Sequence, residues 1–171
     1  MNLVAQLARV LPLALALAFP CTAAAQTGSA HMQAKFELTF DCERPFVVKN
    51  HPIHAAFNAV LNTDKSASAD LALTGVIFTN TVHFAGRLGG GTQAAPGGSG
   101  LLRVISSNRL QAVWDLPNNQ LVLDITAAKS SCSTALNIRL KPGKTEYSMY
   151  NGHSFYYCSA YRLLGSSCQA Q

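Results

Sequence analysis

The stretch RLQAVWDLPNNQLVLDI, residues 109–125, decides the fold because it holds two alternating segments joined by a turn. Apolar residues recur at every second position of 110–114 and again of 121–125. A period of two is typical of a strand with one buried face. Pro117-Asn118-Asn119 supplies the turn, since proline fixes φ and asparagine tolerates left-handed φ. The stretch therefore predicts a β-hairpin, which carries Trp114, the only tryptophan of the chain.

Further segments with strand character surround this hairpin. Lys35–Asp41 alternates cleanly between apolar and polar residues, which predicts a half-buried strand. Asn151-Gly152 lies between strand-like runs and is a strong hairpin signal. Whether 71–88 forms two strands or one bent strand stays open at this stage. The other expected strands are Phe46–Val48, Leu71–Thr79, Thr81–Leu88, Leu101–Ile105, Leu136–Leu140, Thr145–Tyr150 and Ser154–Arg162.

One segment favours a helix. His51 occupies an N-cap position and Pro52 the first helical position, where a missing N–H costs nothing. The apolar residues that follow are spaced i, i+3, i+4, i+7, i+8, which makes one apolar stripe. They are Ile53, Ala56, Phe57, Val60 and Leu61. We therefore expect one short α-helix near 52–62, packed on the sheet because so short a helix is unstable alone.

The remaining segments are expected to connect these elements. Ser66–Asp70 is small and polar, and Gly89–Gly100 contains six glycines, so the sequence predicts a linker and a mobile loop. Leu163–Gln171 is expected to be a tail closed by Cys168. The fold class is then mainly β: an antiparallel sandwich or partly closed barrel of about eight strands, in one domain over 34–171.

The N-terminal 25 residues resemble a secretory signal peptide. Arg9 precedes a short apolar run, and Ala23–Ala25 offers a cleavage site near Ala25. Pro20 fits poorly with lipid attachment at Cys21. Residues 26–33 follow as a flexible linker, in which Gly28–Met32 is either native or a cloning scar. The sequence therefore predicts a periplasmic or secreted protein.

Removal of that segment leaves four cysteines, Cys42, Cys132, Cys158 and Cys168. An even number in an exported chain predicts two disulfides, with three possible connectivities. We favour a bridge from Cys42 to the C-terminal region. No Cys-x-x-Cys pair is present, so the cysteines do not predict a zinc site.

Charge patterning argues against a nucleic-acid partner. Thirteen basic and eight acidic residues give a net charge of +5, and the basic residues are scattered apart from the short cluster in 139–144. A nucleic-acid surface requires a basic stripe with interleaved aromatic residues. The pattern is typical of a solvated face instead.

All five tyrosines lie in the predicted C-terminal hairpin. Tyrosine joins a large apolar body to a hydroxyl and suits interfaces, although aromatic residues also fill strands for packing alone. We expect Tyr147 to point inward with Met149. The candidate binding residues are then the two other tyrosines nearest the turn and two turn residues: Tyr150, Asn151, His153 and Tyr156.

Histidines and carboxylates give little support for catalysis. His51 and His54 are three positions apart but lack a third ligand nearby, so neither a metal site nor a cofactor is expected. No G-x-S-x-G motif occurs. The best enzymatic hypothesis is a ribonuclease-like secreted hydrolase assembled from His83, Arg87, Glu146 and His153.

These features favour an exported, non-enzymatic module that binds another protein, such as an inhibitor, an immunity protein or an envelope accessory protein. Loops and hairpin tips on rigid scaffolds commonly carry recognition. A carrier of small apolar ligands is the alternative, and it would need an internal cavity of roughly 300 Å³ or more. The hydrolase would bring two of His83, Glu146 and His153 into one cleft.

Overall fold

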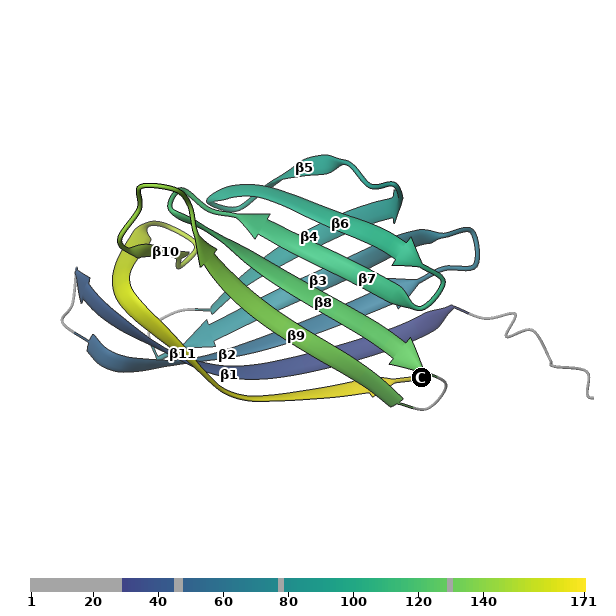
Figure 1. The fold of residues 1–171 in the computed structure, drawn as a ribbon, viewed down its shortest axis with the longest axis horizontal. Coiled ribbons are helices and arrows are strands. Elements are labelled where there is room, and N and C mark those ends of the chain that lie inside the picture. Colours follow the sequence, from purple (N-terminus) through teal and green to yellow (C-terminus); the bar gives the residue numbers. More distant parts are fainter. Residues whose placement is uncertain (1–28, 45–47, 77–78, 129–130) are drawn as a thin grey trace, which may run out of the picture.

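The computed structural model describes residues 29–44, 48–76, 79–128 and 131–171, and most of them lie in eleven β-strands of one sheet (Figure 1). The prediction of a mainly β protein is confirmed, with more strands than expected. The strands are β1 (Ala30–Arg44), β2 (Val48–Leu61), β3 (Ser66–Gly75), β4 (Thr79–Leu88), β5 (Thr92–Ala95), β6 (Gly98–Ser106), β7 (Arg109–Asp115), β8 (Asn119–Ala128), β9 (Ser131–Leu140), β10 (Tyr147–Tyr150) and β11 (Phe155–Ala170).

The sheet curls into a nearly closed barrel in the order β10-β11-β1-β2-β3-β4-β6-β7-β8-β9, with β5 paired to β6 (Figure 1). All pairs are antiparallel except β4 with β6. At the junction of β9 and β11, which we call the seam, no backbone hydrogen bond joins the two strands among the described residues. The Cys132–Cys168 disulfide and a hydrogen bond from the Ile138 amide to the Tyr161 hydroxyl (3.3 Å) connect them instead.

The interior is filled by the inward faces of the strands. On β1, for example, Phe36, Leu38 and Phe40 are at most 3% exposed, and the residues between them face outward. Trp114 is fully buried, and its indole N–H donates to the Pro96 carbonyl at 3.0 Å. Each large apolar side chain buried in this way stabilises the fold by roughly 1.5–3 kcal/mol. The inward faces of the strands therefore form one core inside the nearly closed barrel.

The hairpin expected from residues 109–125 is confirmed. β7 and β8 pair in register from Arg109↔Thr126 to Asp115↔Gln120. The Leu116 amide donates to the Asn119 carbonyl at 2.9 Å, which closes the turn. In both strands, the residues that face the core are the ones that the alternating apolar pattern predicted.

The predicted helix near 52–62 is wrong, because this segment is part of strand β2. Its inward residues are His51, Ile53, Ala55, Phe57, Ala59 and Leu61. Alanines at both odd and even positions allowed the segment to match a helical stripe as well as a period of two. Pro52 does not disrupt the sheet, since β3 pairs with β2 only from Ile53 onward and leaves one side of Pro52 without a ladder.

The glycine-rich segment 89–100 is also ordered, in contrast to the mobile loop that we expected. Thr92–Ala95 forms β5, and Gly98 begins β6. At Gly98 a Cβ atom would lie 1.9 Å from the Asp115 carbonyl oxygen, so glycine permits close approach of β7. The side-chain amide of Gln93 then joins β5 to β4, by accepting from the Ala85 amide (2.9 Å) and donating to the His83 carbonyl (2.8 Å).

Three other expectations about connections need correction. Ser66–Asp70 belongs to β3 and is no linker, and the expected tail 163–171 continues β11 as far as Ala170. The question left open for 71–88 is answered in favour of two strands, since β3 ends at Gly75 and β4 begins at Thr79. Residues 30–33 of the expected linker belong to β1, and His31 exchanges backbone hydrogen bonds of 3.0 and 2.8 Å with Gln171. The predicted signal peptide, residues 1–25, and positions 46 and 47 lie outside the described residues.

Candidate functional site

The four predicted binding residues gather at one end of the barrel, where β10 turns into β11 (Figure 1). We call residues 150–157 the hairpin tip. Strand pairing continues up to Tyr150↔Phe155, so the turn is only four residues long. Both flanking strands are continuous with the sheet, which fixes the position of the tip on the scaffold.

Asn151 organises the turn. Its side-chain oxygen accepts from the backbone amides of His153 (2.9 Å) and Ser154 (2.7 Å). Its side-chain nitrogen donates to the Tyr156 hydroxyl at 2.8 Å. Asparagine commonly bonds backbone groups two residues ahead, and so holds a turn in one conformation. Gly152 adopts φ +99°, which glycine takes without strain.

Tyr150 anchors the tip to the rest of the barrel. Its hydroxyl donates to the Gly152 carbonyl (2.9 Å), and its ring lies 5.1 Å from the Phe155 ring, centroid to centroid. The Asn80 side-chain amide donates to the Tyr150 carbonyl at 3.4 Å. A Cβ atom at Gly97, in the β5–β6 turn, would lie 2.7 Å from the Tyr150 ring. Tyr150 is therefore packed between its own turn and a second one.

Of the four predicted binding residues, one is exposed. His153 is exposed, whereas Tyr150, Asn151 and Tyr156 are half-buried. Tyr157, which we did not single out, is 38% exposed. The alternation around Cys158 could have indicated this, because a buried half-cystine places its neighbours on the outer face.

The inward expectation for this hairpin holds in part. Met149 is buried, whereas Tyr147 is half-buried and packs edge-on against Tyr161 at 5.1 Å.

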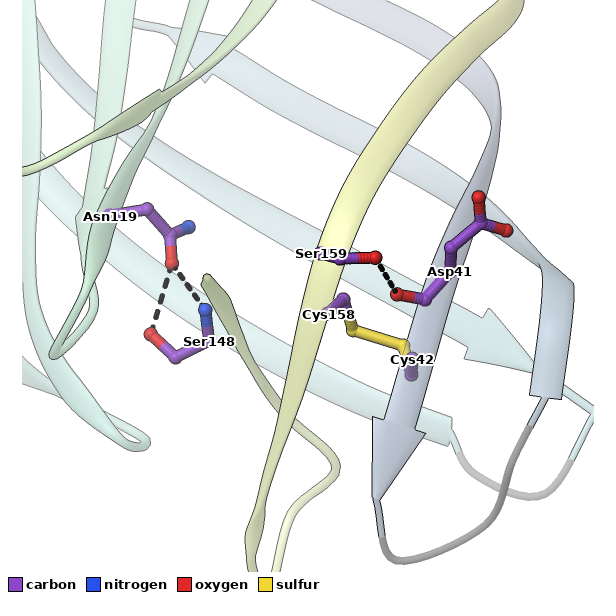
Figure 2. The surroundings of a disulfide bond; sticks show 6 residues. All are labelled: Asp41, Cys42, Asn119, Ser148, Cys158 and Ser159. Atoms are coloured by element: carbon purple, nitrogen blue, oxygen red, sulfur yellow. Dashed lines mark hydrogen bonds between the residues drawn. A yellow bond between two sulfur atoms is a disulfide. The ribbon is translucent and has the colours of Figure 1, made fainter. Parts of the chain in front are cut away.

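A disulfide and two sets of hydrogen bonds connect β10 and β11 to the rest of the barrel (Figure 2). The Cys42–Cys158 disulfide joins β1 to β11, which confirms the predicted link from Cys42 to the C-terminal region. The Ser159 hydroxyl donates to the Asp41 carbonyl at 3.3 Å. The buried Asn119 side-chain oxygen accepts from the Ser148 amide (2.7 Å) and hydroxyl (3.0 Å). No sequence pattern indicated this last pair.

The residues of the hydrolase hypothesis lie on different elements. His83 is on the outer face of β4, with its Nδ1 2.5 Å from an Asp70 carboxylate oxygen on β3. His153 is at the hairpin tip, and Glu146 is exposed just before β10. Arg87 is near the end of β4. The hydrogen bonds and ion pairs described for these residues join none of the four to another.

His51 and His54 face opposite sides of β2, since His51 is buried and His54 is exposed. Burial lowers the pKa of His51 below its ordinary value, because desolvation disfavours the imidazolium. Within the described ranges, no three His, Cys, Asp or Glu side chains are close enough to hold a metal ion.

Two open depressions on the surface of the described residues are larger than a third one of about 160 Å³, which includes Thr92 and Gln120. One, of about 430 Å³, is at the barrel end opposite the hairpin tip and is lined by residues such as Leu61, Lys65 and Val104. The other, of about 280 Å³, lies on the outer face of β11, β1, β2 and β3 and includes Gln33, Asn58 and Asp70. Both open to solvent, and the first also reaches the core residues Leu61 and Val104.

Comparison with known proteins finds no matching family model, curated protein or solved structure. Among the described residues, no helix long and apolar enough to cross a membrane is found.

Proposed function

We propose that this protein is an exported, non-enzymatic module that binds another protein through its hairpin tip. An inhibitor, an immunity protein or an envelope accessory protein would fit this description. The two disulfides suggest an oxidising extracellular environment, since such bonds persist mainly outside the reducing cytosol. Export through the N-terminal 25 residues is part of the proposal.

The observation that carries the proposal is the fixed conformation of the tip. Asn151 holds the turn through three hydrogen bonds, and Tyr150 packs against Phe155 and the Gly97 turn. A preorganised loop loses little conformational freedom on binding, so more of its contact energy appears as affinity. His153 and Tyr157 supply exposed groups of the kinds that interfaces use.

The filled interior favours this proposal over a carrier of apolar ligands. A carrier needs an apolar cavity to hold its ligand. Here the space inside the sheet is occupied by side chains, among them Phe36, Phe57 and Trp114. The hydrolase hypothesis gains no support either, because its residues lie on separate elements.

Affinity capture tests the proposal. The purified, oxidised protein is immobilised and exposed to envelope and secreted fractions of its source, and captured proteins are identified by mass spectrometry. Binding of the partner is then measured for Tyr156→Ala, Tyr157→Ala and His153→Ala. We expect at least one of these variants to weaken binding about tenfold or more, as interface hot spots do.

Leu164→Ala is the matched control, because Leu164 is an exposed apolar residue on the same strand, 58% exposed and away from the tip. It should leave the affinity unchanged. A partner that binds all three tip variants as tightly as the unaltered protein would place recognition elsewhere and refute the assignment to the hairpin tip.

A further inference from the structure

A row of polar side chains crosses five strands on the outer face of the barrel. Strand register places Gln169, Gln33, Asn58, Asp70 and His83 directly beside one another on β11, β1, β2, β3 and β4. Since neighbouring strands are about 4.8 Å apart, the row spans roughly 19 Å. The sequence alone does not indicate this alignment, because the five residues are spread from position 33 to position 169.

The surface is hollowed along this row. The groove of about 280 Å³ is lined by four residues of the row and by the row beside it, which includes His31, Ser68 and Gln171. The Gln33 side-chain amide donates to the Asn58 side-chain oxygen at 2.8 Å, and Asp70 contacts His83. These contacts join two pairs of side chains, and the Gln33–Asn58 bond uses one polar atom of each amide and leaves the other atom of each outside that bond.

The chemistry of the lining selects the ligand. Among the described residues, no lysine or arginine lines the groove, so the lining offers no such cation for a phosphate or sulfate. Asp70 is the only acidic side chain among the described residues of the lining, which is too little charge for a polycation. Val60 is the largest apolar residue on its outward face, so a hydrophobic anchor has no pocket. The polar groups of the lining are therefore amides, a carboxylate, imidazole and hydroxyl groups. Such groups form hydrogen bonds with neutral ligands whose own polar groups can both donate and accept.

We propose that this groove binds a neutral oligosaccharide. A sugar presents adjacent hydroxyl groups, each a donor and an acceptor, which match the side-chain amides of Gln33, Asn58 and Gln169. The Asp70 carboxylate accepts from a hydroxyl more strongly than a neutral group does. An extended peptide fits less well, because its backbone would need a free sheet edge, whereas here the groove lies on a sheet face whose backbone groups are already paired.

The site is separate from the hairpin tip. The groove includes Gln171 and lies toward the end of the barrel where β11 finishes, whereas the tip lies where β11 begins. Loss of saccharide binding and loss of partner binding would therefore be independent results.

The test uses the purified, oxidised full chain and three neutral probes, cellotriose, maltotriose and triacetylchitotriose. Trigalacturonate, trilysine and tetra-alanine serve as anionic, cationic and peptide probes. Binding is measured by calorimetry, and the site is located by chemical-shift changes of the Gln33 and Asn58 side-chain amides. We expect at least one neutral saccharide to bind with Kd below about 1 mM and to shift these two amides.

Asn58→Ala and Asp70→Ala should each weaken that binding about tenfold, since each removes a hydrogen bond to the ligand. Asn137→Ala is the matched control, because Asn137 is an exposed, outward asparagine on β9, and it should leave the affinity unchanged. The proposal is overturned if no neutral saccharide binds, if a charged probe or the peptide binds this groove instead, or if Asn58→Ala and Asp70→Ala both bind as the unaltered protein does.

Discussion

Asn119 shows how one buried polar side chain can join parts of the sheet that share no backbone ladder. It lies at the start of β8, and its oxygen accepts two hydrogen bonds from Ser148 of β10. Both residues are fully buried. The Ser148 hydroxyl in turn accepts from the Asn118 amide at 3.0 Å. A buried donor without a partner is costly, so each member of this network depends on the others.

Asn119→Ala should therefore lower the free energy of unfolding by about 3 kcal/mol, because it leaves the buried Ser148 amide without its acceptor. Urea denaturation followed by tryptophan fluorescence measures this. Asn118→Ala is the control, since only the backbone of Asn118 takes part in the network, and we expect a change below about 0.5 kcal/mol. Equal losses in the two variants would show that the buried network contributes little.

His51 makes stability depend on pH. Burial lowers its pKa in the folded protein, so the unfolded chain binds a proton more readily. Its contribution is complete above the ordinary pKa of about 6.5 and is lost progressively as the pH falls from there toward the lowered folded value. Unfolding free energies measured between pH 7.5 and 5.5 should decrease, and His51→Leu should reduce that slope. His54→Leu, on the outer face of the same strand, should retain it; a slope unaffected by His51→Leu would contradict this origin.

At the scale of the element, the residues that a turn can accept depend on the side chains packed against it. Gly97 and Gly143 both adopt positive φ, at +72° and +75°. They differ in surroundings, because a Cβ at Gly97 would meet the Tyr150 ring, whereas a Cβ at Gly143 would meet nothing within 4 Å. The two glycines therefore separate the cost of backbone conformation from the cost of packing.

Gly143→Ala should destabilise the protein by about 1 kcal/mol, the cost of positive φ for a residue with a Cβ. Gly97→Ala should cost more, about 2–3 kcal/mol, because the Tyr150 ring must also move. Thermal unfolding of the two variants measures the difference. In the Tyr150→Ala background, Gly97→Ala should cost less stability than it does in the unaltered protein. If Gly97→Ala and Gly143→Ala lower stability equally, the Tyr150 ring moves aside at no cost.

The elements that the sequence predicted correctly are those with a single periodicity. In 109–125 only a period of two fits. In 52–61 the alanines at both odd and even positions also fit a helical stripe, and only the neighbouring strands β1 and β3 decide between the two patterns. In 89–100 the glycines indicated flexibility, but Gly98 is required by contact with β7. Asn151 and Tyr150 followed from a local turn signal; the groove could not be predicted, because its residues meet only through the register of distant strands.

For the whole molecule, the two disulfides have different roles. Cys42–Cys158 joins β1 and β11, which already share a backbone ladder. Cys132–Cys168 joins β9 and β11 across the seam, where backbone pairing is absent among the described residues. The sequence separations are 116 and 36 residues, so loop-closure entropy favours the first bond by about 1 kcal/mol.

We expect the double variant Cys42→Ser/Cys158→Ser to lose more equilibrium stability, and Cys132→Ser/Cys168→Ser to loosen the seam more. Amide hydrogen exchange checks this: the second variant should show faster exchange in β9, whereas the first should leave β9 close to the unaltered protein. Free energies of unfolding from urea titrations complete the comparison. Faster exchange in β9 only when Cys42 and Cys158 are replaced would reverse the assigned roles.

The paired backbone of His31 and Gln171 makes the protein a suitable subject for circular permutation. A short glycine linker could join residue 171 to residue 29 with little displacement, and new ends could open in the exposed Lys141–Lys144 turn. In such a permutant β10 and β11 would come first in the chain and be synthesised before the strands that they border. The order of synthesis could then be varied while the native arrangement of strands stays the same.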